Sequence, residues 1–372
     1  MSVRRVLMTC DAVGGVWRYA LDLSRGLAER DLEVILLGLG PEPSAHQRAE
    51  ADALPGVTLT WCDAPLDWLA PSLDRLSAVP DSLARAAGEH GVDLLHLNLP
   101  SQAADLVTDR PVVVASHSCL ATWWRAVRGE PLPAAWGRQA GLTQAGLERA
   151  DAVVVPTRAH ADAVRACYGM AIGMDVVSNA VVPQPEIEDA AKEPFVVAAA
   201  RWWDDGKNVG LIDRAAADAE WPVVLAGALT GPDGRVVDVG NVRALGAQPG
   251  DEVRRLMARA EILVSPSLYE PFGLAALEAA SAGSALVLSD IPTYRELWNG
   301  AARFVDPADP SGLALALNEL AHAPQQRASL QQAASQRAHR LSIRRQAKAM
   351  AAVYERAAAS QRPSLAALTV AV

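Results

Sequence analysis

Short apolar runs alternate with longer stretches of helical period along the first half of the chain. After the first apolar run, Trp17–Arg30 is rich in Ala, Leu and Arg and predicts a helix. The apolar runs themselves predict strands at Arg5–Met8, Leu32–Leu37, Leu94–Leu97, Val112–Ala115 and Ala152–Val155. Strands that alternate with helices indicate βα units, which build a parallel sheet.

The alternation is interrupted after Val182 by Pro183, Pro185 and the charged run that follows, and this interruption predicts a linker between two domains. The pattern then starts again. Strands are expected at Phe195–Ala199, Val223–Ala226, Ile262–Ser265, Ala285–Leu288 and Arg303–Val305, and helices near Asn208–Asp218, Asp251–Ala260 and Gly273–Ala282. From about Pro310 to Ala359 nearly all of the chain favours helix.

A chain of 372 residues is longer than one hydrophobic core usually supports. We therefore predict an α/β protein of two Rossmann-like domains that face each other across a cleft. The N-terminal domain is expected over residues 1–183 and the C-terminal domain over 184–345. A helix over 346–360 is expected to return to the first domain, and 361–372 to form a tail. Ligands of such sheets bind at the carboxyl ends of the strands, so the loops there should line the site.

Composition narrows the class of protein. The net charge of −9 argues against general affinity for nucleic acid, which needs a basic face. The four cysteines lie far apart without a C-x-x-C pair, which favours reduced thiols. No apolar run reaches the 18 or so residues of a membrane span, and the first run breaks at Asp11, too early for a signal peptide. These features indicate a soluble, cytoplasmic protein and leave peripheral contact with the inner face of the membrane open.

Two glutamates frame the loop after the predicted strand Ile262–Ser265. Glu270 is expected on this loop and Glu278 about one and a half turns into the following helix. The unpaired N–H groups at the start of that helix suit an anionic or hydroxyl-rich ligand; they belong to Phe272, Gly273 and Leu274. Both carboxylates can then accept hydrogen bonds from sugar hydroxyls. The alternative is an ordinary turn with two surface glutamates.

Two basic residues lie on the loop after the strand Phe195–Ala199. Arg201 and Lys207 are six residues apart ahead of a helix and can converge on a diphosphate. Asp204 and Asp205 lie between them and would repel a pyrophosphate unless they point outward or recruit a cation. The alternative is that both basic residues are surface charges.

These two loops resemble the E-x7-E and G-R-x5-K motifs of family 4 glycosyltransferases, which have the GT-B fold and retain the anomeric configuration. The resemblance covers residues 3 to about 358 and is strongest from 195 to 300. It implies that Glu270 holds the donor hexose together with the helix-start amides, and that Glu278 holds the ribose. Arg201 and Lys207 would neutralise the leaving nucleoside diphosphate, so no metal or other cofactor is expected.

Two further glycine loops resemble parts of the same family. Gly14 and Gly15 follow the first strand, where glycines permit positive φ and close approach of the backbone to a ligand. The family has a similar loop that faces the donor phosphates and the acceptor, which implies donor contacts for both glycines and an acceptor contact for Trp17. Gly246 lies in a turn that resembles the one whose backbone contacts the base.

His117 follows the strand Val112–Ala115. A lone histidine there is more often structural than catalytic, but the position resembles that of the family's histidine beside the anomeric carbon. The resemblance implies that His117 stabilises positive charge at that carbon and holds a sugar hydroxyl. Trp123 and Trp124 come soon afterwards and predict stacking on a carbohydrate acceptor; filling a core or shielding a lipid-facing patch is the alternative.

The resemblance thus predicts a retaining glycosyltransferase with His117, Glu270, Arg201 and Lys207 as catalytic residues. It would transfer a hexose from a nucleotide-diphosphate sugar to a carbohydrate or glycolipid acceptor by front-face substitution, in the assembly of polysaccharide or glycolipid. A GT-B epimerase of nucleotide sugars and a non-catalytic protein that binds them are the alternatives. A nicotinamide oxidoreductase is disfavoured because no G-x-G-x-x-G motif with a following acidic residue is present.

Overall fold

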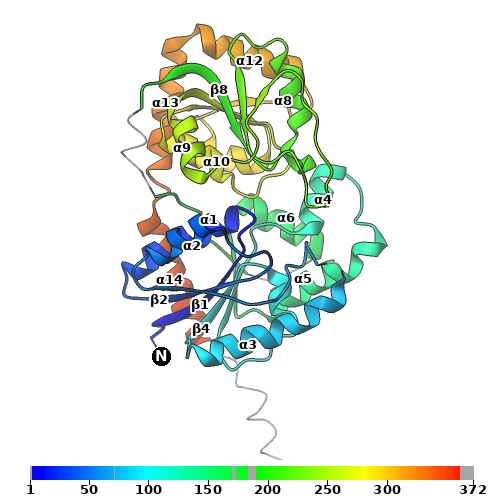
Figure 1. The fold of residues 1–372 in the computed structure, drawn as a ribbon, viewed down its shortest axis with the longest axis vertical. Coiled ribbons are helices and arrows are strands. Elements are labelled where there is room, and N and C mark those ends of the chain that lie inside the picture. Colours follow the sequence, from blue (N-terminus) through cyan, green and yellow to red (C-terminus); the bar gives the residue numbers. More distant parts are fainter. Residues whose placement is uncertain (1, 71, 170–172, 183–189, 361–372) are drawn as a thin grey trace, which may run out of the picture. The chain divides into compact units, whose positions relative to one another are not determined.

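The computed structural model describes residues 2–70, 72–169, 173–182 and 190–360, which divide into two compact units (Figure 1). One unit contains Met1–Thr122, Pro131–Ala180 and Ile343–Val372, and the other contains Trp123–Glu130 and Val181–Ser342. The linker predicted at Pro183 and Pro185 and the tail predicted over 361–372 lie outside the described residues.

The first unit is built on a seven-stranded sheet in which every neighbouring pair is parallel, in the order β3-β2-β1-β4-β5-β6-β7. The strands are β1 (Arg5–Cys10), β2 (Glu33–Gly38), β3 (Val57–Trp61), β4 (Leu94–Leu97), β5 (Val112–Ala115), β6 (Ala152–Val155) and β7 (Met174–Val176). The strand order reverses between β1 and β4, and the loops that leave their carboxyl ends diverge there. This is the point at which such a sheet holds its ligand.

Helices cover the sheet of the first unit. They are α1 (Gly15–Ala28), α2 (Ala45–Asp52), α3 (Val79–Glu89), α4 (Leu120–Arg128), α5 (Gly137–Arg149), α6 (Arg158–Tyr168) and α14 (Ile343–Ala359), with short 3-10 turns η1 (Leu73–Ala78), η2 (Pro100–Ala103) and η3 (Ala134–Trp136). The last part of α4, from Trp123, groups with the second unit.

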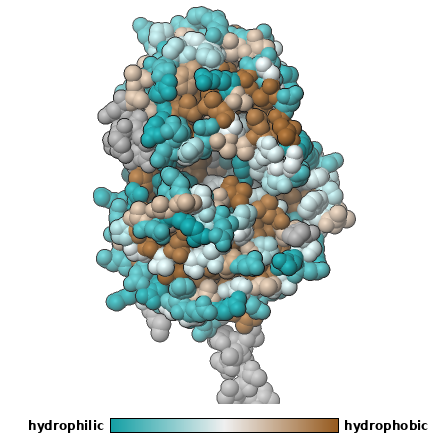
Figure 2. All heavy atoms as spheres, viewed as in Figure 1, coloured by the Kyte–Doolittle hydropathy of each residue, from teal (hydrophilic) through white to brown (hydrophobic). Residues whose placement is uncertain are grey.

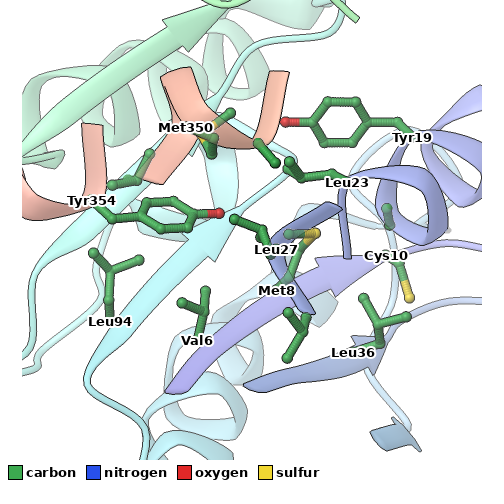
Figure 3. Close-up of a cluster of buried hydrophobic side chains, with 14 of the residues drawn as sticks. Val6, Met8, Cys10, Tyr19, Leu23, Leu27, Leu36, Leu94, Met350 and Tyr354 are labelled. Carbon is green, nitrogen blue, oxygen red and sulfur yellow. The ribbon is translucent and has the colours of Figure 1, made fainter. Parts of the chain in front are cut away.

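The final helix α14 is part of the first unit's core. It packs on α1 at Gly26, where a Cβ atom would lie 2.5 Å from Ile343 Cγ2 and 2.9 Å from the Cβ of Ala347. Figure 3 shows Met350 and Tyr354 of α14 beside α1 side chains, above the strand residues Val6 and Met8. Only glycine at position 26 lets the two helices approach this closely.

The second unit has a six-stranded sheet, also parallel at every neighbouring pair, in the order β10-β9-β8-β11-β12-β13. Its strands are β8 (Glu193–Ala199), β9 (Val223–Ala226), β10 (Arg243–Ala244), β11 (Ala260–Ser265), β12 (Ala285–Ser289) and β13 (Arg303–Val305). Its helices are α8 (Val209–Ala216), α9 (Gly250–Arg259), α10 (Leu274–Ser281), α11 (Pro292–Trp298), α12 (Pro310–His322) and α13 (Pro324–Ala338), with the 3-10 turn η4 (Asp205–Lys207). Here the order reverses between β8 and β11, the strands that precede the two charged loops.

The predicted α/β class with two Rossmann-like sheets is confirmed. The predicted strands agree with the observed ones to within two residues at each end. The sequence pattern missed β3, β7 and β10. These strands lie at or next to sheet edges, where half-exposed positions break up the apolar run that marks a buried strand.

Candidate active site

The loop after β8 is held rigidly at the point where the order of the second sheet reverses. The Asp204 carboxylate accepts a hydrogen bond from the Gly206 N–H (2.9 Å) and so caps the turn η4. Asn208 ends the turn with φ +57, and its Nδ2 donates to the carbonyls of Pro266 (3.0 Å) and Pro307 (2.8 Å). The Leu268 N–H donates to the Gly206 carbonyl at 2.9 Å. The loop after β8 is therefore fastened to the loop after β11.

This fastening brings Lys207 to Glu270, 63 residues further along the chain. Lys207 Nζ lies 2.6 Å from Glu270 Oε2, and the two side chains are only 17% and 16% exposed. A half-buried pair of opposite charges strengthens as solvent is excluded, so each side chain fixes the position of the other. The structure thus joins a cation suited to phosphate with a carboxylate suited to sugar hydroxyls.

Gly273 sets the start of α10 beside that pair. Its φ is +91, a left-handed conformation that favours glycine, and a Cβ atom there would lie 2.7 Å from Tyr294 Cε1. Tyr294 is fully buried, and its hydroxyl lies 2.6 Å from Ser265 Oγ. Phe272 is buried before the glycine, while Leu274 begins the helix and Glu278 lies half-buried one turn on. Glycine at 273 therefore lets α10 begin close to the Glu270 side chain, whose Cγ would lie 3.4 Å from a Cβ atom at this position.

Asp204 and Asp205 neither stand free nor form a cluster of acidic groups. Asp204 Oδ1 also accepts from the Trp123 indole N–H at 2.9 Å. Asp205 pairs with Arg128 (2.5 Å) and Arg235 (3.0 Å). Burial raises the pKa of Asp205, but the hydrogen bonds and charges of these arginines outweigh it and lower the pKa below its ordinary value. Nearby arginines therefore compensate the negative charge of both aspartates, which reduces the repulsion of a pyrophosphate that the sequence led us to expect.

Arg201 contacts two neighbours on its own loop. Its guanidinium lies over the Trp203 ring, 5.2 Å from the ring centre, and 3.9 Å from Asp204 Oδ2. The side chain is 40% exposed. The structure therefore places both basic residues on one loop, and the ion pair with Glu270 is made by Lys207.

The structure changes the interpretation of the tryptophans predicted to contact the acceptor. Trp17 is 6% exposed in the first core, and its indole N–H lies 3.3 Å from Glu50 Oε2, so little of its ring can face a sugar. Trp123 is bound to Asp204 in the second unit. Trp124 is half-buried beside it, and the Arg128 guanidinium lies 5.2 Å from the Trp123 ring centre and 5.9 Å from that of Trp124.

His117 lies at the carboxyl end of β5 in the first unit. Its Nε2 is 2.8 Å from Asn98 Oδ1, and the edge of the Tyr19 ring meets its ring with the centroids 4.3 Å apart. Burial lowers the pKa of His117 to about 3, with further contributions from His96 and His160. The imidazole is therefore neutral near pH 7 and can hold a sugar hydroxyl without acting as a charged acid.

The loop of Gly14 and Gly15 is shaped differently from the prediction. Gly14 is extended, with φ −142, and Gly15 begins α1, so neither needs the positive φ that the sequence suggested. Asp11 forms the turn instead: its Oδ1 accepts from the N–H groups of Val13 (2.9 Å) and Gly14 (3.2 Å). The glycines contribute a backbone without side chains rather than an unusual conformation.

Gly246 has φ +69, and its carbonyl accepts a hydrogen bond of 2.8 Å from the N–H of Gly227. Gly227 has φ +129, and a Cβ atom there would lie 1.8 Å from the Ala200 carbonyl oxygen. The turn that carries Gly246 is thus connected through Gly227 to the start of the Arg201 loop.

Sequence reasoning missed four residues that shape these loops, namely Asp11, Asn98, Asn208 and Gly227. Asp11, Asn98 and Gly227 directly follow strands β1, β4 and β9. A search for polar or glycine residues at the first position after each predicted strand would have found Asn98 and Gly227. It would have missed Asp11, because the first strand was predicted to end at Met8, two residues before the end of β1. Asn208 gives a weaker signal, because it depends on a left-handed turn that the sequence does not mark.

The remaining surface features are few. Within the described ranges, no three or more His, Cys, Asp or Glu side chains are grouped so that they could hold a metal ion. No helix among the described residues is long and apolar enough to cross a membrane. On the face shown in Figure 2, apolar patches interrupt a largely hydrophilic surface. Exposed aromatic side chains of the first unit include Trp68 (36%) and Trp136 (44%).

Comparison with known proteins agrees with this architecture. Family models described as Glycosyltransferase Family 4 and Glycosyl transferases group 1 match residues 13–184 and 239–337. The chain is 30% identical to the O-antigen chain mannosyltransferase B of Escherichia coli over 33% of this chain and 27% of that protein. It is 28% identical to the D-inositol 3-phosphate glycosyltransferase of Xylanimonas cellulosilytica over 92% of both chains.

A solved structure has the same fold. HepE of Anabaena in complex with UDP-glucose superposes with a TM-score of 0.73 at 19% identity, over 94% of this chain and 99% of that one. Several curated relatives are much longer than the matched part, since the chain covers only 18 to 27% of their length.

Two parallel α/β units, each with its charged or polar loops at the reversal of strand order, define the GT-B class of glycosyltransferases. Within that class, the chain belongs to glycosyltransferase family 4.

Proposed function

We propose that this glycosyltransferase transfers a hexose from a nucleoside-diphosphate sugar to a carbohydrate or glycolipid acceptor, with retention of configuration and without a metal. The observation that carries the proposal is the Lys207–Glu270 pair, 2.6 Å apart beside the start of α10. It combines a charge that suits a phosphate with a carboxylate and backbone N–H groups that suit sugar hydroxyls.

The donor would be held by residues of the second unit. Lys207 and Arg201 supply the positive charge that the departing diphosphate needs, and the donor site takes the place of a metal in this role. Glu270 and the amides of Phe272, Gly273 and Leu274 hold the hexose, Glu278 the ribose, and the turn at Gly246 the base. The Gly14–Gly15 loop of the first unit contributes its backbone to the donor phosphates.

The reaction proceeds on one face of the sugar. The bond between the anomeric carbon and the diphosphate oxygen breaks while the acceptor oxygen bonds to the same face of that carbon. The acceptor proton passes to the departing phosphate oxygen, so no protein base is required. Neutral His117 stabilises the developing positive charge through its carbonyl oxygen and ring.

The relatives support the chemical class of both substrates. HepE binds UDP-glucose, and one relative is a mannosyltransferase of the O-antigen chain, so a nucleotide hexose and a growing or lipid-linked saccharide fit this chain. Such an acceptor would be met at the inner face of the membrane by a cytoplasmic protein, in the assembly of surface polysaccharide. Of the three tryptophans predicted to contact the acceptor, Trp124 is the one that we propose lines the acceptor site.

The test is thermal unfolding against UDP-, GDP-, ADP- and TDP-hexoses in EDTA, with wild type, Glu278→Ala and the control Glu252→Ala. Glu252 is an exposed glutamate of α9. A donor at about 100 times its Kd should stabilise wild type and the control by about 2.7 kcal/mol and the Glu278 variant much less.

Transfer is then measured with the donor that binds. Retention is read from the anomeric configuration of the product. Donor turnover without an acceptor would indicate the epimerase, and binding without transfer or hydrolysis would indicate a silent sugar-nucleotide-binding protein. Stabilisation only by a metal or a nicotinamide cofactor would overturn the proposal.

A further inference from the structure

Three neighbouring strands of the first sheet end in a buried set of hydrogen bonds. Thr9 lies in β1, Asn98 follows β4, and His117 comes two residues after β5. The order β1-β4-β5 places these strand ends side by side. Asn98 is 2% exposed and Thr9 1%, so their polar groups depend on one another rather than on water.

The hydrogen-bond partners of the Asn98 side-chain amide determine its orientation. Its Nδ2 lies 2.6 Å from the Thr9 carbonyl oxygen, which can only accept a hydrogen bond. Its backbone N–H donates to Thr9 Oγ1 at 2.8 Å, and that hydroxyl donates onward to Gln102 Oε1, also at 2.8 Å. The amide oxygen of Asn98 must therefore be the atom that faces His117.

That orientation selects one form of His117. An amide oxygen 2.8 Å from Nε2 is satisfied only if Nε2 carries the proton. A neutral ring with its proton on Nε2 has a lone pair on Nδ1. Within the described part of the chain, no hydrogen bond from a side chain or the backbone reaches Nδ1, so this lone pair is left for a ligand.

The surroundings of the ring keep it neutral. His96, His160 and Tyr19 lie close to His117, from β4, α6 and α1, and none of them brings a negative charge. The hydroxyls of Tyr19 and Tyr354 lie 3.5 Å and 2.6 Å from the two ring nitrogens of His96, so that histidine is itself held by α1 and α14. Burial lowers the pKa of both His96 and His117 to about 3.

We propose that Asn98 is a positioning residue that holds His117 with its proton on Nε2, so that Nδ1 accepts a hydrogen bond from a hydroxyl of the bound sugar. The choice of a sugar hydroxyl as the ligand rests on the proposed function, whereas the proton position does not. A carboxylate or a deoxygenated carbon at the same place cannot donate to Nδ1, so the site selects hexoses over hexuronic acids and deoxyhexoses there.

The proton position is measured first, by long-range proton–nitrogen NMR of histidine-labelled protein, with His117→Gln to assign the signals. Wild type should show a protonated Nε2 and an unprotonated Nδ1. Asn98→Ala should lose this preference, and Asn98→Asp should keep it and titrate at higher pH because a carboxylate replaces the amide oxygen. Gln346→Leu, which removes another buried amide of the same unit, should leave the His117 signals unchanged.

A wild-type His117 protonated on Nδ1 would overturn the inference, even if no Asn98 variant folds. So would an Asn98→Ala protein whose His117 signals match wild type.

The ligand is tested with the nucleotide hexose that stabilises the protein and with its hexuronate and singly deoxygenated analogues. One deoxy analogue should bind wild type about tenfold more weakly, the scale of one hydrogen bond, and bind Asn98→Ala no more weakly than the parent sugar does. Equal losses in both proteins would overturn the hydroxyl contact. If no nucleotide sugar binds at all, the proposed function fails while the NMR result still decides the proton position.

Discussion

Lys207 Nζ and Glu270 Oε2 lie 2.6 Å apart, although three strands and two helices, β9, β10, β11, α8 and α9, come between them in the chain. Each side chain is needed by the other, since a half-buried charge without a partner is costly. The ion pair therefore keeps both side chains in place, and in the proposed reaction the diphosphate would share Lys207 with Glu270.

Lys207→Ala should lower turnover by about 10² to 10³, the usual effect of losing one preorganised electrostatic contact to a developing charge. Glu270→Gln should lower it less, because a carboxamide still accepts hydrogen bonds from a sugar but no longer fixes the lysine. The measurement is steady-state transfer with the donor found in the thermal screen.

The control for this prediction is Arg303→Ala, which breaks an exposed ion pair with Glu319 in the same unit. It should leave turnover unchanged. Turnover of Lys207→Ala equal to that of wild type would remove Lys207 from the proposed mechanism.

The fold could be predicted because buried parallel strands are continuous apolar runs. Val112–Ala115 and Val223–Ala226 were predicted to the residue. The edge strand Val57–Trp61 was missed because its residues are half-exposed and alternate with threonine. The grouping of Trp123–Glu130 with the second unit could not be predicted either, because it depends on contacts with Asp204 and Asp205 rather than on a local pattern.

Candidate residues could be selected from the sequence where they belong to a motif on one loop, as for Glu270 and Gly273, and their roles in binding remain predictions. The site was not predictable where partners come from different strands. Asn98 precedes His117 by 19 residues, and only the strand order brings them together. Trp17 shows the opposite error: its place after the glycine loop suggested a ligand contact, but the face of α1 on which it lies turns it into the core.

Trp123→Phe should loosen the Arg201–Lys207 loop. The variant keeps the aromatic ring but removes the indole N–H that donates to Asp204, the residue that caps the turn before Lys207. We expect a loss of about 1 kcal/mol in the free energy of unfolding and an increase of up to about tenfold in the Kd of the donor. Urea unfolding and donor titration measure the two effects.

The matched control is Trp124→Phe. The Trp124 indole nitrogen is buried without a hydrogen-bond partner, so its removal costs no hydrogen bond. Equal effects of the two substitutions on donor affinity would show that the Asp204 contact does not position the loop.

Gly273→Ala should reduce donor binding by misplacing the start of α10. The substitution combines a left-handed backbone, φ +91, with a Cβ atom 2.7 Å from a carbon of the buried Tyr294 ring. Strain of this kind costs on the order of 1 to 3 kcal/mol before the steric clash is added.

Gly300→Ala is the control for strain alone, because φ there is +79 but a Cβ atom would meet nothing within 4 Å. Calorimetric titration should find weakened donor binding in the Gly273 variant only; equal affinity in both variants would mean that the start of α10 does not hold the donor.

The first unit should lose stability in mild acid because it buries neutral histidines. Burial lowers the pKa of His96 and His117 to about 3 and that of His160 to about 4, from 6.5 in the unfolded chain. The unfolded chain therefore binds more protons between pH 6.5 and about 3, and stability that is complete above pH 6.5 is lost as the pH falls through this range. The free energy of unfolding at pH 5.5 should therefore be lower than at pH 7.5 by about 1.4 kcal/mol for each histidine, or about 4 kcal/mol for the three.

The measurement is urea unfolding at these two pH values. Burial also raises the pKa of Asp67 in the first unit, so urea unfolding at the two pH values is compared between wild type and histidine variants. His160→Gln should reduce the difference by about a third, whereas His46→Gln, which removes an exposed imidazole, should leave it unchanged. The same pH dependence in His160→Gln as in wild type would show that His160 takes up its proton in the folded state as readily as in the unfolded one.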